Sequence, residues 1–582
     1  MLFISVFLYF ISPIIQASET EYTLEPVVVK ANSSFDSLNE DTYLPQKKVI
    51  FNSNRSGTLS SFEQTQVYPA SDLGFPGGAN GVNLGGRSLD DTQVSTLGVP
   101  LNLPQGGGPD LSIFPSYLWS GASISTVPSA AGFSPQGVSG SIQLDLWTRT
   151  QVRDLKFSTP VSRITVNYDR NLQNFSMASK TQNIAIIAGM NFGRQTGPAA
   201  SLSYYFIKKP KSHFLFHLLG TQQDADSPGS KSFPSPNDKI KTWRVIPVLE
   251  SHQEFGEERD LIIWESTYYG DLQQLRFEDP SPSNSTNDHI QEYGVENAIH
   301  WHESTLALSA RLTNYQSSTF GNVNDWPIMA QLSHDFILSD QWKMKLAGGG
   351  TAVSSTGFSP TARASFKNEL SSRASWFYEL NSLAKMPTLT SRYYVSPFFH
   401  GNPSLSPERV NGLIAGYQDT IANIETTTTA KAEYRNQIQV SQNNTIQNAG
   451  NASLISANED LTWRVIPELA LRNSTLLTYS RVAQSAFTYP DLPYFSTLLG
   501  FTLLPTDSFK FSGNLRYQGQ STTSTGGVHA DYLLLDSWLE YSPTDGTFFT
   551  LGCENITDSR AEVVVDFPLP GRIAYLNARV NF

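Results

Sequence analysis

The sequence is short of three features that would have placed it in a common class. It has a single cysteine, Cys553, among 582 residues, so no intrachain disulfide can form. Its 40 Lys and Arg are outnumbered by 52 Asp and Glu, and the net charge of −12 removes the attraction on which nucleic-acid binding depends. No apolar run reaches the roughly 20 residues that a membrane-spanning helix needs. These observations disfavour a redox role for cysteine, a nucleic-acid partner and a helical membrane bundle.

The longest apolar run, Leu2 to Ile15, lies at the N-terminus and is too short to cross a membrane as a helix. It leads into Ile15-Gln16-Ala17, which can serve as a signal-peptidase site. We therefore expect residues 1–17 to be a signal peptide, and the near absence of cysteine is compatible with export. No Lys or Arg precedes the run, a departure that a start a few codons upstream would explain.

The C-terminal segment from Ile573 onward alternates between two faces. One face carries Ala574, Leu576, Ala578, Val580 and Phe582, and the other carries Tyr575, Asn577, Arg579 and Asn581. Successive side chains of a strand point to opposite sides, so one face is apolar and the other polar. A membrane barrel strand needs this arrangement, with lipid on one side and a lumen on the other. A soluble sheet can alternate in the same way, so the rest of the chain has to decide.

The same alternation recurs from about Asn167 onward. It is clear over Phe509 to Tyr517, and two similar turns, LPTD at 504–507 and SPTD at 542–545, are spaced like one up-and-down pair of hairpins. Barrel strands of about 9 to 11 residues with their connections would give about 22 strands over residues 148–582, the number of the plugged class. About 16 or 18 strands would also fit this length.

Residues 51–147 have a different character. Glycine clusters at 77–78, 85–86 and 106–108 separate short mixed strands, which indicates a compact domain ahead of the barrel. The predicted organisation is a signal peptide at 1–17, an extended segment and linker at 18–50, an α/β domain at 51–147 and an all-β transmembrane barrel at 148–582.

Four segments in chain order carry a resemblance to a known family. They are VNLGGR at 82–87 with LGVPLN at 97–102 and GGGPDLS at 106–112, then AKMPTL at 384–389 with GNPSLSPE at 401–408, then ENITD at 554–558, and finally PGR at 570–572 with the terminal Phe582. Together they resemble the motifs of TonB-dependent outer-membrane receptors, with a length similar to that of cobalamin receptors. The resemblance implies an N-terminal plug inside a 22-stranded barrel in the outer membrane of a Gram-negative bacterium. Gly98 departs from the pattern, because the family usually has Asp there.

By this resemblance, LEPVVV at 24–29 is a TonB box. Its members are Leu24, Glu25, Pro26, Val27, Val28 and Val29. The three β-branched residues favour an extended conformation, and such a segment can add a strand to the sheet edge of a partner. The implied partner is TonB with the inner-membrane ExbB–ExbD complex. The alternative is that Val27 to Val29 form the first strand of the plug.

Within the plug, the resemblance singles out Arg87, because family plugs carry a basic residue here that pairs with carboxylates of the barrel wall. A turn arginine in contact with water is the alternative. The family binds its ligand above two plug apices. The corresponding candidate contacts in this chain are Gly77, Gly78, Asn80, Asn102, Gln105, Gly106, Gly107 and Gly108.

Two groups of residues could bind metal. Asp224, Asp226 and Asp238 fall in an expected outer loop from Thr221 to Lys239 and offer oxygen ligands for a structural Ca²⁺, a role known in cobalamin receptors of this family. A solvated acidic loop is the alternative. His300 and His302 are spaced to share a strand face and could bind a metal, although such residues more often line a polar lumen. No other cofactor is expected.

We interpret the chain as a monomeric transporter, in contact with outer-membrane lipid, that imports a scarce small-molecule or metal-chelate ligand. It has neither a phosphate-binding loop nor a Gly-x-Ser-x-Gly elbow, so we do not expect an enzyme. The plug segment around 101–115 is similar to that of cobalamin receptors and favours a corrinoid, with a ferric siderophore close behind. A passive porin or a structural barrel without energised transport is the alternative, and an outer-membrane enzyme is a more distant one.

Overall fold

The computed structural model describes residues 47–581 apart from 51–66, 73–79, 85–88, 104–106, 127–137, 150–160, 170–171, 181–182, 210, 228–231, 233, 236, 258–259, 280–284, 319–320, 397–398, 443–444, 449, 484–491, 523–526, 545 and 565–566. Everything below concerns the compact unit Leu38–Phe582. Several predictions fall outside the described residues. They concern the signal peptide at 1–17, the segment from Leu24 to Val29, Gly77, Gly78, Arg87, Gln105, Gly106 and Phe582.

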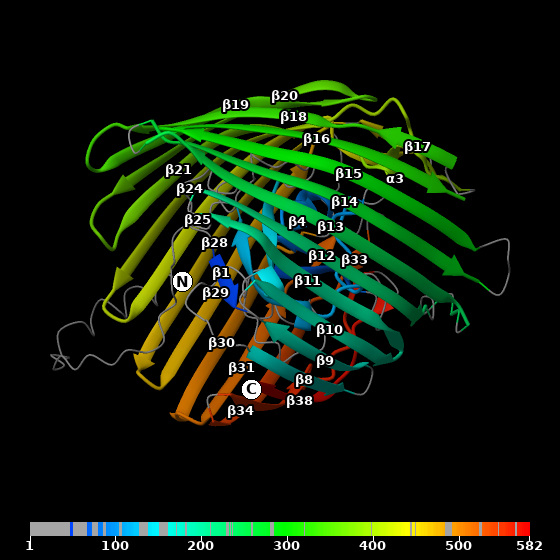
Figure 1. Ribbon diagram of the computed structural model, residues 1–582, viewed down its shortest axis with the longest axis vertical. Helices are drawn as coiled ribbons and strands as arrows, with labels where there is room; N and C mark the ends of the chain where they lie inside the picture. The colour runs from blue at the N-terminus through cyan, green and yellow to red at the C-terminus, as the bar shows by residue number, and fades with distance from the viewer. Residues whose placement is uncertain are drawn as a thin grey trace. The chain divides into compact units, whose positions relative to one another are not determined.

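Most described residues form one closed antiparallel barrel (Figure 1). Its strands are β8 (Val161–Asp169), β9 (Leu172–Lys180), β10 (Ile184–Gly193), β11 (Gln195–Lys209), β12 (Ser212–Asp226), β13 (Lys239–Phe255), β14 (Ile262–Glu278), β15 (Thr286–Trp301), β16 (Ser304–Ser317), β17 (Gly321–Asp325), β18 (Ile328–Ile337), β19 (Trp342–Val353), β20 (Gly357–Glu369), β21 (Ser375–Lys385), β24 (Glu408–Ile421), β25 (Ile424–Asn436), β28 (Asn451–Ile466), β29 (Leu469–Val482), β30 (Phe495–Thr506), β31 (Phe509–Gln518), β34 (Tyr532–Thr544), β35 (Thr547–Glu554) and β38 (Ile573–Asn581).

The barrel has 22 strands in the described part of the chain, because β17 and β18 are two pieces of one strand. Both pieces pair with β16, and the break between them falls at Trp326 and Pro327. Proline has no backbone N–H for the ladder, so pairing stops there and resumes at Ile328. The predicted strand number is therefore confirmed.

The C-terminal strand closes the barrel as expected. β38 pairs with β8, with Tyr575 opposite Asp169 and Asn581 opposite Arg163. Its two faces are also as predicted, because Leu576 is 51% exposed on the outside whereas Asn577 is fully buried on the inside. Among the described residues, no helix is long and apolar enough to cross a membrane.

The plug is a mixed sheet in the order β1-β6-β7-β4-β5, in which β4 and β7 are parallel. Its strands are β1 (Lys47–Ile50), β4 (Thr92–Thr96), β5 (Val99–Pro100), β6 (Trp119–Ser125) and β7 (Gly140–Leu146), beside a hairpin of β2 (Val67–Asp72) and β3 (Asn80–Leu84). Its described helical parts include the short 3₁₀ turns η3 (Leu89–Asp91) and η4 (Ser116–Leu118), so it is poorer in helix than the predicted α/β domain. The sheet also begins before residue 51, because β1 pairs with β6.

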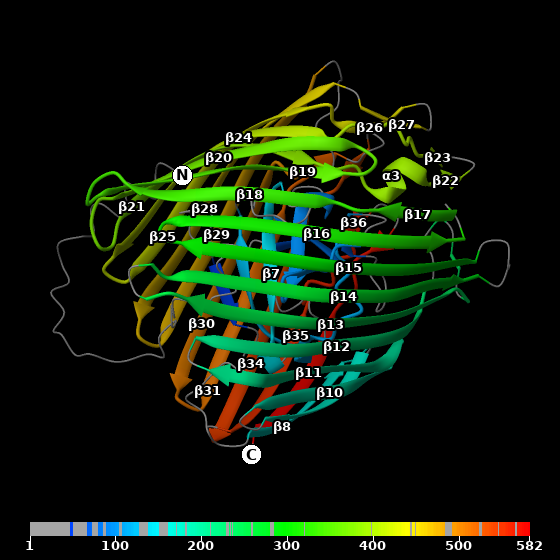
Figure 2. The same ribbon diagram turned by 45° about the horizontal axis from the view of Figure 1, so that its top comes forward.

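The plug packs against the inner wall of the barrel. A continuous cluster of buried apolar residues joins Ile142 and Leu144 of β7 to inward residues of the wall such as Leu219 of β12 and Ile246 of β13. Figure 2 shows the plug strands within the ring of barrel strands. The cluster thus extends from the apolar core of the plug to the inner wall, and burial of this apolar surface stabilises the seated sheet.

The two ends of the barrel differ in their connections. At one end, here called the long-loop end, lie the connections 227–238, 386–407, 437–450, 483–494, 519–531 and 555–572, whereas the opposite, short-turn end has connections such as 302–303, 422–423 and 467–468. The long loops carry α3 (Leu389–Tyr393), β22 (Val395–Ser396), β23 (Phe399–His400), β26 (Gln439–Gln442), β27 (Thr445–Asn448), β32 (Ser521–Thr522), β33 (Val528–His529), β36 (Glu562–Val564) and β37 (Phe567–Pro568). Figure 2 shows α3, β22, β23, β26 and β27 gathered at one end of the barrel.

Aromatic side chains gather on the barrel near the short-turn end. Trp376 and Tyr417 on neighbouring strands have ring centroids 4.8 Å apart, and Phe509 and Tyr541 stack at 4.7 Å. Above them toward the long-loop end the outward residues are aliphatic, as with Leu380 and Leu413. An apolar band bordered by aromatic rings is typical of a membrane barrel.

A glycine under an aromatic ring allows us to test barrel closure. The inward ring of Tyr575 in β38 lies directly over Gly552, its partner in β35. We expect Gly552→Val to displace this ring and destabilise the barrel by about 1–3 kcal/mol through overpacking. The measurement is the urea midpoint of the transition from the folded to the unfolded band in unheated gels.

Gly348→Val in β19 is the matched control, because nothing lies within 4 Å of a Cβ added there. It should leave the midpoint unchanged. Equal midpoints for the two valine variants would show that the contact between Tyr575 and Gly552 does not support closure.

Candidate functional site

The first plug-to-barrel contact centres on Asp91 at the end of η3, which is fully buried. Its Oδ1 lies 2.8 Å from Nζ of Lys385 in β21, and its Oδ2 lies 2.8 Å from Nη2 of Arg435 in β25. Lys385 also reaches Oδ2 of Asp90 at 2.8 Å. The plug therefore meets two barrel cations through two consecutive carboxylates.

Barrel carboxylates complete this group. Arg435 lies 3.3 Å from Glu433 and 3.9 Å from Glu408, and Glu408 accepts a hydrogen bond of 2.8 Å from the backbone N–H of Gln439. We call the six residues Asp90, Asp91, Lys385, Glu408, Glu433 and Arg435 the latch cluster. Charges of both signs alternate through it, which is the condition for burying ions inside a protein.

The latch cluster fixes the charge state of its central carboxyl. Burial alone would raise the pKa of Asp91, but the guanidinium of Arg435 and the ammonium of Lys385 outweigh burial and hold this pKa well below its usual range. Asp91 in the seated plug is thus an anion at neutral pH. An uncharged side chain at this position would leave two buried cations short of a partner.

The polarity of this contact is the reverse of the one expected for Arg87. The prediction placed a plug cation against barrel carboxylates, and Arg87 itself lies outside the described residues. Three and four residues further on, at Asp90 and Asp91, the plug supplies the carboxylates and the barrel supplies the cations. The consecutive acids Asp90 and Asp91 and the lysine of the AKMPTL segment were the available signals in the sequence.

A second contact holds the edge strand of the plug. Arg244 of β13 is buried and pairs with Asp271 of β14 through Nε at 2.9 Å. It also donates to two plug carbonyls, those of Leu101 and Pro100, each at 3.2 Å. Because β5 is the last strand of its sheet, its carbonyls lack a strand partner on that side, and the guanidinium fork supplies donors instead.

A third contact lies where the plug chain leaves its sheet. Nε of Arg149 is 3.1 Å from Glu250, and Nε2 of His217 lies 3.5 Å from the same carboxylate. The Nδ1 of His217 is 2.7 Å from the hydroxyl of Ser203, which donates to Thr148 of the plug. This order of Ser, His and Glu resembles a catalytic triad, but Ser203 and His217 are fully buried and cannot reach a substrate.

The plug apex follows β5 and carries three of the predicted ligand contacts. The amide of Asn102 donates to the carbonyls of Thr92 and Gly107 at 2.8 and 2.7 Å and accepts from the N–H of Val94 at 2.7 Å. Gly107 has a φ of +74°, and an added Cβ would collide with Thr388 of a long loop. Asn102 therefore shapes the apex from within, and Gly107 allows the loop to approach it.

A cavity of about 80 Å³ lies between this apex and the long-loop end of the wall. Pro100 and Asn102 of the plug border it, together with Arg311 of β16 and the loop residues from Met386 to Arg392. The guanidinium of Arg392 lies over the ring of Tyr393 and pairs with Asp325 at 3.4 Å. Ligand pockets usually measure about 300–1,000 Å³, so this space could hold only one group of a large ligand.

The remaining predicted residues are dispersed. Asn80 lies in β3, and Gly108 lies with Gly107 at the apex. Because β12 continues to Asp226 rather than ending at Thr221, Asp224 and Asp226 lie in a strand, on the face opposite the buried Gln223 and Ala225. Asp238 is buried in the following loop.

The described residues contain no group of three or more His, Cys, Asp or Glu side chains that could hold a metal ion. The role of calcium stays a prediction. His300 contacts Thr305 and lies 3.7 Å from Glu265, whereas His302 falls in a turn with a φ of +48°, so the two do not share a strand face as expected. Cys553 is a half-buried residue of β35 with a free thiol.

A closed 22-stranded barrel that holds an N-terminal mixed sheet is the architecture of TonB-dependent receptors, as the sequence motifs predicted. No protein-family model and no curated protein matches the sequence.

Solved structures match over nearly the whole chain. The siderophore receptor PirA from Acinetobacter baumannii has a TM-score of 0.76 at 10% identity, covering 95% of this chain and 100% of PirA. A mutant of the ferric enterobactin receptor PfeA from Pseudomonas aeruginosa has a TM-score of 0.74 at 11% identity, with coverages of 95% and 100%. The FrpB iron transporter from Neisseria meningitidis has a TM-score of 0.74 at 10% identity, with coverages of 92% and 99%. At these identities the likeness is one of fold.

The latch cluster leads to a prediction for plug seating. Asp91→Asn keeps the size of the side chain but removes the charge that Lys385 and Arg435 share, and breaking a buried pair in this way costs about 3–5 kcal/mol. We expect faster hydrogen exchange at the amides of β4, measured by mass spectrometry on the purified full-length protein. Asp90→Asn is the matched control, because Asp90 is 24% exposed and solvent screens its charge, so its effect should be much smaller. Similar exchange in both variants would contradict a central role for Asp91.

The pKa of Asp91 gives the same contact a pH dependence. Because this pKa is lower in the seated plug than in an unfolded chain, the carboxylate stabilises the seated plug at neutral pH. That contribution is lost as the pH falls below the usual carboxyl value of about 3.9 toward the lowered value. Protection of the β4 amides in the native protein should therefore decline in acid more steeply than in Asp91→Asn. Parallel pH profiles would contradict this assignment.

Proposed function

We propose that the chain is an energised outer-membrane receptor that binds a large, scarce ligand at its long-loop end and admits it when the plug is displaced. The observation that carries the proposal is a lumen filled by a plug whose carboxylate, Asp91, is fully buried between two barrel cations, Lys385 and Arg435. A plug seated in this way obstructs diffusion. A passive porin would need an open lumen instead.

Displacing such a plug requires work, because it separates the buried carboxylate of Asp91 from Lys385 and Arg435, and breaking a buried pair costs about 3–5 kcal/mol. The sequence contains no phosphate-binding loop, so the chain has no means of its own to use ATP. A mechanical pull from the periplasm fits this requirement. We propose Leu24 to Val29 as the segment that is pulled and TonB with ExbB–ExbD as the partner that pulls it.

For the ligand we propose a ferric siderophore. The structures that share this fold include a ferric enterobactin receptor, a siderophore receptor and an iron transporter. Arg311 and Arg392 border the cavity beside the plug apex, and guanidinium groups suit an anionic chelate. A corrinoid is the second candidate, favoured by the similarity of the plug sequence from Leu101 to Pro115 to that of cobalamin receptors.

The proposed energy coupling can be tested by deleting Leu24 to Val29. The deletion should abolish ligand uptake but leave binding at the cell surface nearly unchanged, because the segment is expected in the periplasm. Val28→Pro should act almost as strongly, since proline removes a ladder donor. Uptake and surface binding of radiolabelled ligand are measured in cells with and without TonB.

Ser34→Pro in the expected linker is the matched control for the proline and should transport normally. Undiminished uptake by the deletion variant would overturn energised transport. It would favour the passive barrel.

The ligand class and the role of calcium are tested together on purified protein. We expect ferric enterobactin to bind tightly and cyanocobalamin to bind weakly, in titrations that follow intrinsic tryptophan fluorescence. If calcium orders the loop around Asp238, then a chelator or a triple change of Asp224, Asp226 and Asp238 to Asn should lower affinity by the same factor. Tight corrinoid binding without siderophore binding would reverse the proposed ligand. Affinity that is indifferent to the chelator would remove the metal.

A further inference from the structure

The outer surface of the barrel wall is hollowed over five neighbouring strands, β20, β21, β24, β25 and β28. The hollow has a volume of about 700 Å³. Its inward lining residues Arg363, Asn381 and Glu433 are buried against the lumen, whereas its outward lining residues Leu380, Leu413, Tyr434 and Ile455 are about half exposed. The hollow therefore opens to the outside of the barrel. We call it the wall groove.

Small side chains create the wall groove. One row across the strands runs from Ala364 through Leu380 and Leu413 to Ala432 and Ile455. The alanines at Ala364 and Ala432 leave the space that larger residues occupy elsewhere on the outer face. Leu380 and Leu413 lie between the two alanines, and Ile455 lies beside Ala432, so this row forms an apolar floor at the depth of the aliphatic band.

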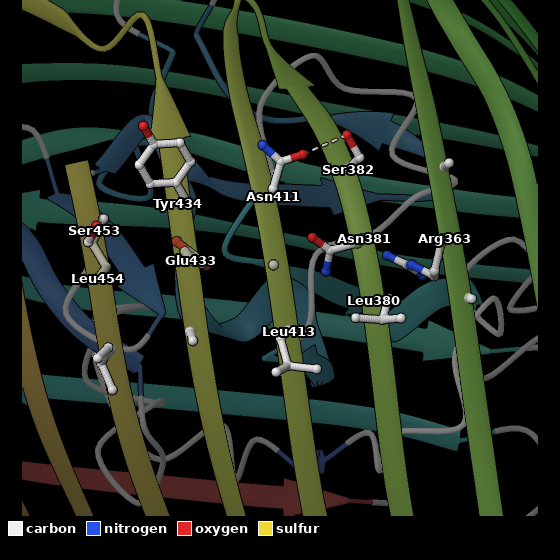
Figure 3. A pocket seen from close by; sticks show the side chains of 15 residues that line it. Arg363, Leu380, Asn381, Ser382, Asn411, Leu413, Glu433, Tyr434, Ser453 and Leu454 are labelled. Carbon is white, nitrogen blue, oxygen red and sulfur yellow. Dashed lines mark hydrogen bonds between the residues drawn. The ribbon is translucent and has the colours of Figure 1, made fainter. Parts of the chain in front are cut away.

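The next row toward the long-loop end is polar. It contains Ala362, Ser382, Asn411, Tyr434 and Ser453 in register. The hydroxyl of Ser382 donates to Oδ1 of Asn411 at 2.9 Å, and Figure 3 shows this bond bridging β21 and β24 above Leu380 and Leu413. Polar groups beside an apolar floor would suit the boundary between the head and the chains of a lipid.

A cation completes the sequence of rows. Arg409 lies one further row toward the long-loop end, between Ala384 and Asn436 in register. Its Nη1 donates to the carbonyl of Pro360 in β20, so the guanidinium extends over Ala384 at the upper rim of the wall groove. The row of Arg409 and the two rows below it cross β21, β24, β25 and β28. Among the described residues of these three rows, Arg409 is the one charged side chain.

We propose that the wall groove binds a phosphorylated lipid of the leaflet at the long-loop end. The acyl chains occupy the floor at Ala364 and Ala432, the head-to-chain boundary contacts Ser382 and Asn411, and Arg409 pairs with a headgroup phosphate. The inference rests on the outer-membrane location in the proposed function. The order of the rows, from hydrocarbon through hydrogen-bonding groups to a cation, is the order of groups along a lipid. A protein helix would not require that order.

The test uses the full-length protein in mild detergent and native mass spectrometry, with diphosphoryl lipid A as the added probe. The native protein should retain the lipid. Ala432→Trp fills the floor and should reduce retention by about tenfold, which corresponds to about 1.4 kcal/mol. Ala188→Trp on the outer face of β10 is the matched control, because Ala188 is an exposed alanine of another part of the wall and should not change retention.

A second variant separates the headgroup from the chains. Arg409→Gln should lower the preference for diphosphoryl lipid A over the monophosphoryl form, because it removes the guanidinium that pairs with a phosphate. Heat-modifiable migration in gels confirms that each variant has a folded barrel. Equal retention by the native protein, Ala432→Trp and Ala188→Trp would overturn the proposal.

The outcomes also distinguish this inference from the proposed function. A native protein that fractionates with the outer membrane and takes up ferric siderophore, yet retains no lipid A, would refute the wall groove alone. A native protein absent from the outer membrane would refute both. If the native protein carries a second copy of the chain instead of lipid, and Ala432→Trp loses that copy, the wall groove is a contact between copies. That result would overturn the lipid assignment.

Discussion

The architecture depends on the pairing of backbone hydrogen bonds in a medium that offers none. A strand inside a lipid bilayer must find all of its partners in neighbouring strands, and an open edge is excluded. The pairing of β38 with β8 meets this condition by joining the end of the chain to the start of the barrel. The same condition explains how the wall tolerates Pro327, because β16 continues through the break between β17 and β18 and pairs with both pieces.

A closed wall of this circumference creates a second problem, which the plug solves. Half of every strand faces the lumen, and many of these inward residues are charged, as with Arg244, Lys385 and Arg435. Burying a charge is costly unless it is paired, and Arg244 and Arg435 each have a carboxylate partner within the wall, to which the plug adds further partners. The plug supplies carboxylates at η3 and backbone carbonyls along β5. These polar contacts add to the apolar cluster that the plug shares with the inner wall, so the plug is attached by both kinds of interaction.

Much of this fold could be predicted from local patterns, because a strand's period of two is visible in the sequence. The two faces of the strand after Ile573 followed from it, whereas length alone left the strand number open, and the 22-stranded barrel with a plug inside it was implied by the family resemblance. The latch cluster could not be predicted in the same way, since Asp91, Lys385 and Arg435 are brought together by closure of the barrel around the plug. The expected pairing of Arg87 came from resemblance and stays a prediction, because Arg87 lies outside the described residues.

The acidic residues after Thr221 show how a single misplaced boundary alters a functional inference. A loop that starts at Thr221 leaves the directions of Asp224 and Asp226 undetermined and allows both to join Asp238 as calcium ligands. In the structure β12 continues through Asp226, and the same period of two then places both residues on the face opposite Gln223. The turn-forming residues that follow Asp226 favour a loop, whereas the alternation of residues up to Asp226 favours a strand.

The same strands contact the plug on their inner face and carry the wall groove, the proposed lipid site, on their outer face. In β21 and β24, Lys385 and Glu408 point into the lumen as members of the latch cluster. Their neighbours Ala384 and Arg409 face outward above the wall groove. The hydrogen-bonded ladder fixes the spacing of both faces at once, so neither set can shift along the strand alone. Occupancy of the wall groove can therefore influence plug seating only by changing the tilt or curvature of β21 to β25. A substitution that fills the floor and leaves the ladder intact isolates lipid binding from the ion pairs that hold the plug.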